Sequence, residues 1–145
     1  MATVPAVVAP AVISGQANSA DPAFSPGGDT VYFSRNSTIM ASRRVRGHWS
    51  TPTIAVFSGQ WSDQQPTIAP DGRFIVFVSN RPVKAGDSHP AGNLWRVERR
   101  AGRWGEPVHL PPTVHRDNRS WAPSFAGAGS LFFIEPPGAG APPRS

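Results

Sequence analysis

The sequence repeats itself, and this repetition limits the folds open to the chain more than any other feature. Residues 14–36 align with residues 58–80, 44 positions later and without a gap, so that SPGGDTVYF returns as APDGRFIVF. A third, degraded copy occupies residues 122–134. A second module alternates with the first, because GHWSTP at residues 47–52 returns as GRWGEP at residues 102–107. Two interleaved modules that recur in step indicate an architecture of repeated structural units.

Each repeat is typical of short strands joined by tight turns. Pro, Asp and Gly at residues 70–72 predict such a turn, because Pro fixes φ, Asp caps the bend and Gly accepts a positive φ. A short strand is expected before the turn at residues 66–69 and a longer apolar strand after it at residues 74–79. Further strands are expected at residues 93–99 and 108–110. Four antiparallel strands in about 44 residues match the dimensions of a β-propeller blade.

Composition supports strands over helices. Val and Ile together outnumber Leu by 19 to 3, and β-branched side chains favour sheets. Only residues 30–46 run beyond a dozen positions without Pro or Gly, and turn-prone residues 35–37 interrupt that run. The absence of Cys excludes disulfides, Zn–thiolate sites and thiol catalysis. The predicted fold class is therefore all-β, with four-stranded antiparallel blades in an incomplete ring.

The string PTIAPDGRFIVFVSNR at residues 66–81 resembles the repeat of TolB-type, WD-repeat-like β-propellers, with Ala69 where that repeat has Ser. The Gly-x-Trp-x-x-Pro module resembles the form found in bacterial cell-envelope propellers. The resemblance extends over about residues 7–135, and departs from the pattern at Gly27 and at residues 127–128. A second resemblance, to the Asp-box of sialidase-like propellers, is discounted because the Trp that should follow residues 25–30 is absent.

The resemblance implies about two and a half blades, whereas closed propellers use ~4–8. We therefore expect the chain to be a fragment of a longer protein, or to complete a ring by self-association through its open blade faces. We expect residues 1–135 to form a partial propeller and residues 136–145 to form a disordered Pro/Gly tail. Along the partial propeller, the expected parts are the outer strand of a preceding blade (6–13), blade one (20–58), blade two (62–111) and the first half of blade three (118–135).

The net charge of +5 arises from 14 basic residues, 13 of them Arg, against 9 acidic residues. The Arg residues are spread over loops and strand ends, where charge prevents edge-to-edge aggregation. We therefore expect no nucleic acid partner, although an Arg-rich surface for anionic partners stays open and predicts salt-dependent binding. Residues 1–13 lack the basic start of a signal peptide, Pro5 and Pro10 interrupt them, and no stretch is long enough to span a membrane. The compartment is thus not assigned, while the resemblance implies the periplasm or cell envelope.

Residues with catalytic or metal-binding chemistry are few. The four His residues have no metal-ligand spacing, and no Gly-x-Ser-x-Gly elbow or phosphate-binding Gly loop occurs. We expect no catalytic residue, no metal and no cofactor. Trp49 and Trp104 occupy equivalent positions in successive repeats, which indicates packing between blades. Trp61 and Trp121 precede inner strands, where they either fill the gap between blades or stack on a ligand.

The sequence predicts a non-catalytic propeller module that binds a protein or a cell-envelope component, since TolB-type propellers serve protein–protein contacts. The alternatives are a carbohydrate-active propeller enzyme and the propeller part of a serine peptidase whose catalytic domain is absent here. A glycosidase would need two carboxyl groups facing each other, and Asp21 and Asp63 are the candidates. The expected binding rim lies ahead of the inner strands, and its members are Asp21, Asp63, Gln65, Arg119 and Trp121.

Overall fold

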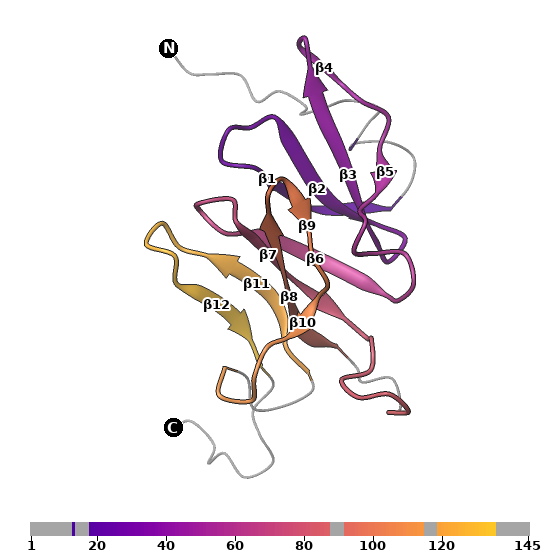
Figure 1. Ribbon diagram of the computed structural model, residues 1–145, viewed down its shortest axis with the longest axis vertical. Helices are drawn as coiled ribbons and strands as arrows, with labels where there is room; N and C mark the ends of the chain where they lie inside the picture. The colour runs from indigo at the N-terminus through magenta and orange to yellow at the C-terminus, as the bar shows by residue number, and fades with distance from the viewer. Residues whose placement is uncertain (1–12, 14–17, 88–91, 115–118, 136–145) are drawn as a thin grey trace.

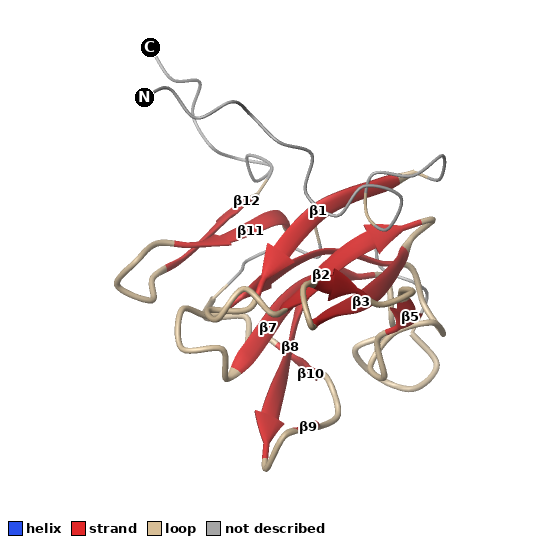
Figure 2. Ribbon diagram, turned by 90° about the horizontal axis from the view of Figure 1, so that it is seen from above, coloured by secondary structure: helices blue, strands red, loops and turns tan. Residues whose placement is uncertain are grey.

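The computed structural model describes residues 13, 18–87, 92–114 and 119–135, and within these residues it contains strands and no helix (Figures 1 and 2). The strands form three antiparallel sheets that follow one another along the chain. The first sheet contains β1 (Ser19–Phe24), β2 (Thr30–Arg35), β3 (Thr38–Val45), β4 (His48–Trp49) and β5 (Thr53–Ile54). The second contains β6 (Asp63–Ile68), β7 (Phe74–Ser79), β8 (Asn93–Arg100), β9 (Arg103–Trp104) and β10 (Val108–His109), and the third contains β11 (Trp121–Phe125) and β12 (Leu131–Ile134).

Sheets one and two have the same plan. In each, an inner strand pairs with a middle strand, the middle strand pairs with a long outer strand, and two short strands pair with that outer strand. The third sheet contains only the inner and middle strands among the described residues. The all-β class and the incomplete ring predicted from the repeats are confirmed.

The inner strand of every sheet carries a β-bulge at the same place. The register shifts between Ala20 and Ala23 in β1, between Gln64 and Thr67 in β6, and between Trp121 and Ser124 in β11. The first residue of each bulge is left-handed, with φ of 55° at Asp21, 53° at Gln65 and 52° at Ala122, and the second residue is Pro. A bulge bends a strand and redirects its side chains, so the repeat in the sequence is also a repeat in backbone shape.

The turn between inner and middle strands forms as predicted in sheet two. Gly72 has φ of 72°, and the Asp71 carboxylate accepts a hydrogen bond of 3.0 Å from the Arg73 N–H. In sheet one, Gly27 replaces the Asp, and a different side chain closes the turn. The Ser25 hydroxyl donates to Asp29 at 2.7 Å, and this hydrogen bond is the main cause of the lowered pKa of Asp29. The departure at Gly27 therefore leaves the turn intact.

Packing between sheets one and two forms the main hydrophobic core. Tyr32, Ile39 and Phe57 of the first sheet and its following loop meet Phe77 and Trp95 of the second. The smaller core between sheets two and three is built from Val76, Leu94 and Leu110, against which residues of β11 and β12 pack. Ile13 packs against Val31 and Phe33 on the other face of sheet one.

Two predicted boundaries differ from the structure. The strand expected at residues 66–69 begins at Asp63, because the bulge lets the chain pair with β7 on both sides of Pro66. A short strand, β9, forms at Trp104, where the sequence predicted only a turn, because the chain folds back onto Arg99 and Arg100. The predicted tail at residues 136–145 and residues 6–12 of the expected N-terminal strand lie outside the described residues.

Candidate functional site

The three bulges line one open groove. Strands β1, β6 and β11 are neighbours, each in a different sheet. Between them lies a groove of about 550 Å³, and its walls are residues 21–23, 65–68 and 122–124. Because these strands are the innermost of their sheets, this groove corresponds to the wall of a propeller's axial channel.

A chain of hydrogen bonds crosses the groove from sheet to sheet. The Ser34 hydroxyl donates to Asp21 Oδ2 at 3.2 Å and accepts from the Gln65 N–H at 2.9 Å. Gln65 Oε1 then accepts from the Ala122 N–H at 2.7 Å. The N–H of each left-handed residue is thus bound by a side chain of the sheet before it. Ser34 of sheet one binds the N–H of Gln65, and Gln65 of sheet two binds the N–H of Ala122. The bulges thus hold the sheets together at the axis.

Asp21 is the predicted rim residue best placed to meet a ligand. Its side chain is exposed, it lines the groove, and its hydrogen bond to Ser34 uses only one carboxylate oxygen. Gln65 also lines the groove but is half-buried, and its side-chain oxygen is used by Ala122. These two residues form the polar part of the groove.

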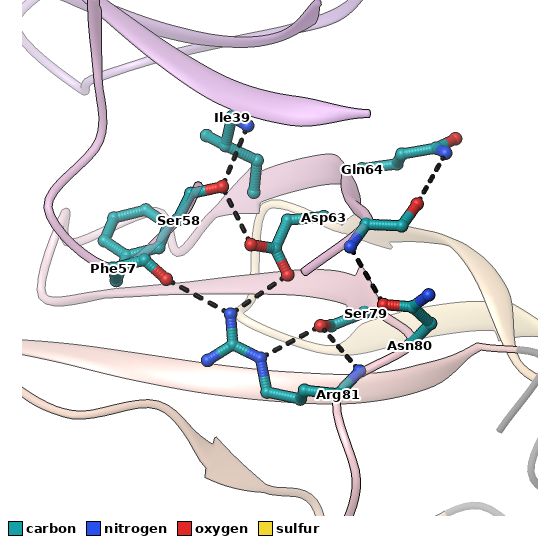
Figure 3. A network of polar contacts seen from close by, with 9 residues as sticks. Ile39, Phe57, Ser58, Asp63, Gln64, Ser79, Asn80 and Arg81 are labelled. Carbon is teal, nitrogen blue, oxygen red and sulfur yellow. Dashed lines mark hydrogen bonds and ion pairs between the residues drawn. The ribbon is translucent and has the colours of Figure 1, made fainter. Parts of the chain in front are cut away.

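Asp63 lies elsewhere, in a buried polar network between sheets one and two (Figure 3). Its Oδ2 accepts from the Ser58 hydroxyl at 2.8 Å, and its Oδ1 forms a 3.0 Å ion pair with Arg81. Arg81 also donates to the Phe57 carbonyl at 3.1 Å and to the Ser79 hydroxyl at 2.9 Å. Both carboxylate oxygens are therefore occupied, and Asp63 has no exposed surface to offer a ligand.

Trp121 and Arg119 are exposed, and neither residue lines the groove. Trp121 is 39% exposed and pairs across the strands with Ile134. Arg119 lies just before β11. The structure thus brings Asp21 and Gln65 together in the groove, leaves Trp121 and Arg119 outside its lining, and buries Asp63 between sheets one and two. Sequence reasoning missed Ser34, which lies opposite the bulge of β1; the repeats carry no signal for it, because Val78 and Ile134 occupy the equivalent positions opposite the other two bulges.

Of the two equivalent Trp residues, Trp104 packs between sheets one and two, as the sequence predicted, whereas Trp49 packs on other residues of its own sheet. Trp104 Nε1 donates to the Tyr32 hydroxyl at 3.0 Å, with its ring edge-to-face on Tyr32 at 5.8 Å. Trp49 lies edge-to-face on Phe24 at 6.1 Å. Trp61 is half-buried in a small hollow beside Phe57 and Arg81, so it lies at the boundary between blades.

The described residues offer no group of three His, Asp or Glu that would hold a metal ion. In the same residues, no helix exists that would be long and apolar enough to cross a membrane.

Comparison with known proteins identifies the fold through a solved structure. No model of a known protein family matches the sequence, and no curated protein matches it either. Among solved structures, the chain is similar to TolB from Acinetobacter baumannii, with a TM-score of 0.57 and 19% sequence identity. The fold is that of a partial TolB-like propeller. The match covers 85% of this chain and 28% of the TolB chain, so this chain corresponds to less than a third of that propeller protein.

Proposed function

We propose that this chain is a non-catalytic propeller module that binds a protein partner at the inner-strand groove. The observation that carries the proposal is the groove itself, which is open, lies across three sheets and presents the exposed Asp21 carboxylate, while the exposed Trp121 directly precedes the groove residue Ala122 in β11. Aromatic anchors beside a polar contact are typical of protein-binding surfaces. The partner chemistry that fits is a polypeptide with a basic residue for Asp21 and an apolar residue for Trp121.

The TolB-like fold supports a binding role at the level of architecture, and the resemblance of the repeats to bacterial cell-envelope propellers favours an envelope component as the partner. A fold alone does not fix a function, so the residues of the groove have to carry the argument.

The carbohydrate-active alternative has less support. A glycosidase needs two carboxyl groups about 5–10 Å apart across the substrate. Asp21 is the one carboxylate among the described residues that line the groove, while Asp63 is buried and paired with Arg81. The serine-peptidase alternative places the catalytic domain outside this sequence, which itself contains no Gly-x-Ser-x-Gly motif, so the geometry of the groove does not bear on it.

The proposal is tested by photo-crosslinking. A photoreactive amino acid at Ser124, which lines the groove, captures the partner in a cell-envelope extract, and the purified partner is then titrated against variants. Asp21→Asn and Trp121→Ala are expected to weaken binding about tenfold each, equivalent to about 1.4 kcal/mol. Glu106→Gln removes an exposed carboxylate that does not line this groove and should leave affinity unchanged.

Two results would contradict the proposal. Equal affinity of all three variants would show that the partner does not use this groove. Release of reducing sugars from cell-wall glycan by the wild type, lost in Asp21→Asn, would support the glycan hydrolase instead.

A further inference from the structure

The hollow beside Trp61 lies between sheets one and two and is separate from the inner-strand groove. It has a volume of about 200 Å³, and its lining residues are 56–58, 60, 61, 81, 106 and 107. These residues belong to the loop between β5 and β6, to the chain just after β7 and to the loop between β9 and β10. Sheets one and two each contain an inner, a middle and an outer strand, so the walls of this hollow do not depend on how far sheet three extends.

The guanidinium of Arg81 is held in a fixed orientation at this hollow. Its Nε donates to the Ser79 hydroxyl at 2.9 Å, while its Nη2 donates to the Phe57 carbonyl at 3.1 Å and to Asp63 Oδ1 at 3.0 Å (Figure 3). The group also lies over the ring of Phe77, 5.1 Å from the ring centre. A side chain that is already fixed loses little conformational entropy when a ligand binds to it.

The third nitrogen of this guanidinium, Nη1, is left for a ligand. No described residue accepts a hydrogen bond from it, and Figure 3 draws no dashed line to it. The Arg81 side chain is 11% exposed and lines the hollow. A guanidinium N–H forms a strong, charge-assisted hydrogen bond with a carboxylate oxygen. Nη1 is therefore a suitable donor to an oxygen of a bound molecule.

A carboxylate that belongs to no ion pair among the described residues lines the same hollow. It is the exposed side chain of Glu106. The charge of Arg81 is already balanced by Asp63, so Glu106 leaves the hollow with a net negative charge. A simple anion is disfavoured in such surroundings. A ligand that fits has to carry a positive group for Glu106 as well as an oxygen for Arg81.

Apolar side chains and the size of the hollow limit the ligand further. Trp61, which is half-buried, and Val56, which is 81% exposed, both line it. An aliphatic group that packs on these side chains is removed from water. Pockets for drug-sized molecules have volumes of about 300–1,000 Å³, so this hollow suits a smaller molecule.

We propose that the hollow binds a free aliphatic α-amino acid. The carboxylate of the amino acid accepts a hydrogen bond from Arg81 Nη1, its ammonium group pairs with Glu106, and its side chain contacts Trp61. A carboxylic acid or a phosphate makes only the first of these contacts, and a simple amine lacks the contact with Arg81. This site lies outside the inner-strand groove and does not depend on the function proposed for that groove.

The first test uses three ligands that differ by one group. L-Valine is titrated into the isotope-labelled full chain, and NMR follows the indole N–H resonance of Trp61, which is assigned by its loss in Trp61→Phe. L-Valinamide lacks the charged carboxylate and isovalerate lacks the ammonium group, so each should bind at least about tenfold more weakly than L-valine. The proposal is overturned if L-valine leaves the Trp61 resonance unchanged, or if either analogue binds as tightly as L-valine.

A matched pair of chain variants tests the carboxylate. Glu106→Gln keeps the size of the side chain and should weaken L-valine binding about tenfold without lowering the melting temperature, because the side chain is exposed. Asp87→Asn removes an exposed carboxylate that does not line the hollow, and should leave the affinity for L-valine unchanged. Equal affinities of Glu106→Gln and the wild type would overturn the proposal.

Arg81→Lys tests the contact with the ligand carboxylate. Lysine keeps a positive charge beside Asp63, but its single nitrogen cannot replace all three guanidinium nitrogens. The variant should bind L-valine about tenfold more weakly, while the weaker binding of L-valinamide changes little. An equal loss for both ligands would show that Arg81 acts only through the structure, and would overturn the proposed contact. If this variant does not fold, the ligand series and Glu106→Gln still decide the proposal.

Discussion

The interfaces on the two sides of sheet two differ in how much of the sheet they cover. Toward sheet one, the whole width is buried, from Asp63 and Arg81 at the inner strand to Trp104 at the outer strand. Toward sheet three, the described residues cover only the inner half, with Phe125, Leu131 and Phe133. Arg96 and Val108 at the outer half of that face line an open groove.

The chemistry differs along with the coverage. The first interface combines stacked aromatic rings with a buried ion pair and a Trp–Tyr hydrogen bond. The second is aliphatic and aromatic packing, joined by backbone contacts such as Ser120 N–H to the Gly92 carbonyl at 3.3 Å. A sheet in this architecture is stabilised by what covers each face, so the first interface should hold most of the stability.

The largest expected effect compares one position in two sheets. Phe77 of β7 is fully buried, and the centre of its ring lies 5.4 Å from that of the Phe57 ring. Its equivalent in β12, Phe133, is half-buried. Phe77→Ala should lower the free energy of unfolding by about 3–5 kcal/mol and Phe133→Ala by about 1–2 kcal/mol, as measured by urea denaturation. If Phe77→Ala does not fold, Phe77→Leu replaces it. Equal losses at both positions would contradict the comparison.

The buried ion pair gives the next largest effect. Asp63→Ala leaves the Arg81 guanidinium, 11% exposed, without its carboxylate, and should cost about 3 kcal/mol in urea denaturation. Arg81→Met combined with Asp63→Ala removes both charges and should recover part of that loss. A double variant that is as unstable as the sum of the single variants would show that the two side chains act independently.

Tyr32 should make the first interface sensitive to alkaline pH. Burial is the main cause that raises the pKa of Tyr32 above its ordinary 10.0, partly opposed by the hydrogen bond from Trp104. A pKa that is higher in the folded state gives a stabilisation that is complete below about pH 10 and is lost as pH rises through the folded pKa. Tyr32→Phe should cost about 1 kcal/mol near neutral pH and flatten this alkaline decline, which urea midpoints over the pH range would measure. Parallel declines in wild type and variant would assign the pH dependence to another group.

The smallest expected effect lies at the exposed edge of sheet three. Trp121→Ala should change the unfolding free energy by no more than about 1 kcal/mol, because its ring is 39% exposed. A loss above about 2 kcal/mol in a thermal or urea melt would show that Trp121 is a packing residue, as the competing interpretation of the sequence holds. A binding defect of Trp121→Ala without a loss of stability would assign Trp121 to ligand contact, and a loss of stability would assign it to packing.

The sequence predicted the architecture because the repeats carry their own turn and strand signals. Pro, Asp and Gly at residues 70–72 act locally, and the spacing of Trp49 and Trp104 shows that they are equivalent without any knowledge of contacts. The candidate site was harder to predict. Asp21 and Asp63 both lie ahead of the proline in an inner strand, but Asp63 stands two residues earlier relative to its bulge, and this offset moves its side chain into the interface. The 44-residue repeat aligns Asp21 with Gln65, so the offset can be read from the sequence, but its effect on the direction of the Asp63 side chain becomes evident only from the paired backbone.

The stepwise order of the three sheets has a consequence for how the chain folds. Among the described strands, each sheet meets only its neighbours in sequence, as in other linear arrays, so none of these contacts joins sheet one to sheet three. Structure should start where sheets one and two join and spread toward β12, giving amide hydrogen exchange that is slowest in β2 and β7 and fastest in β11 and β12. The repeat thus sets a direction for assembly as well as a shape.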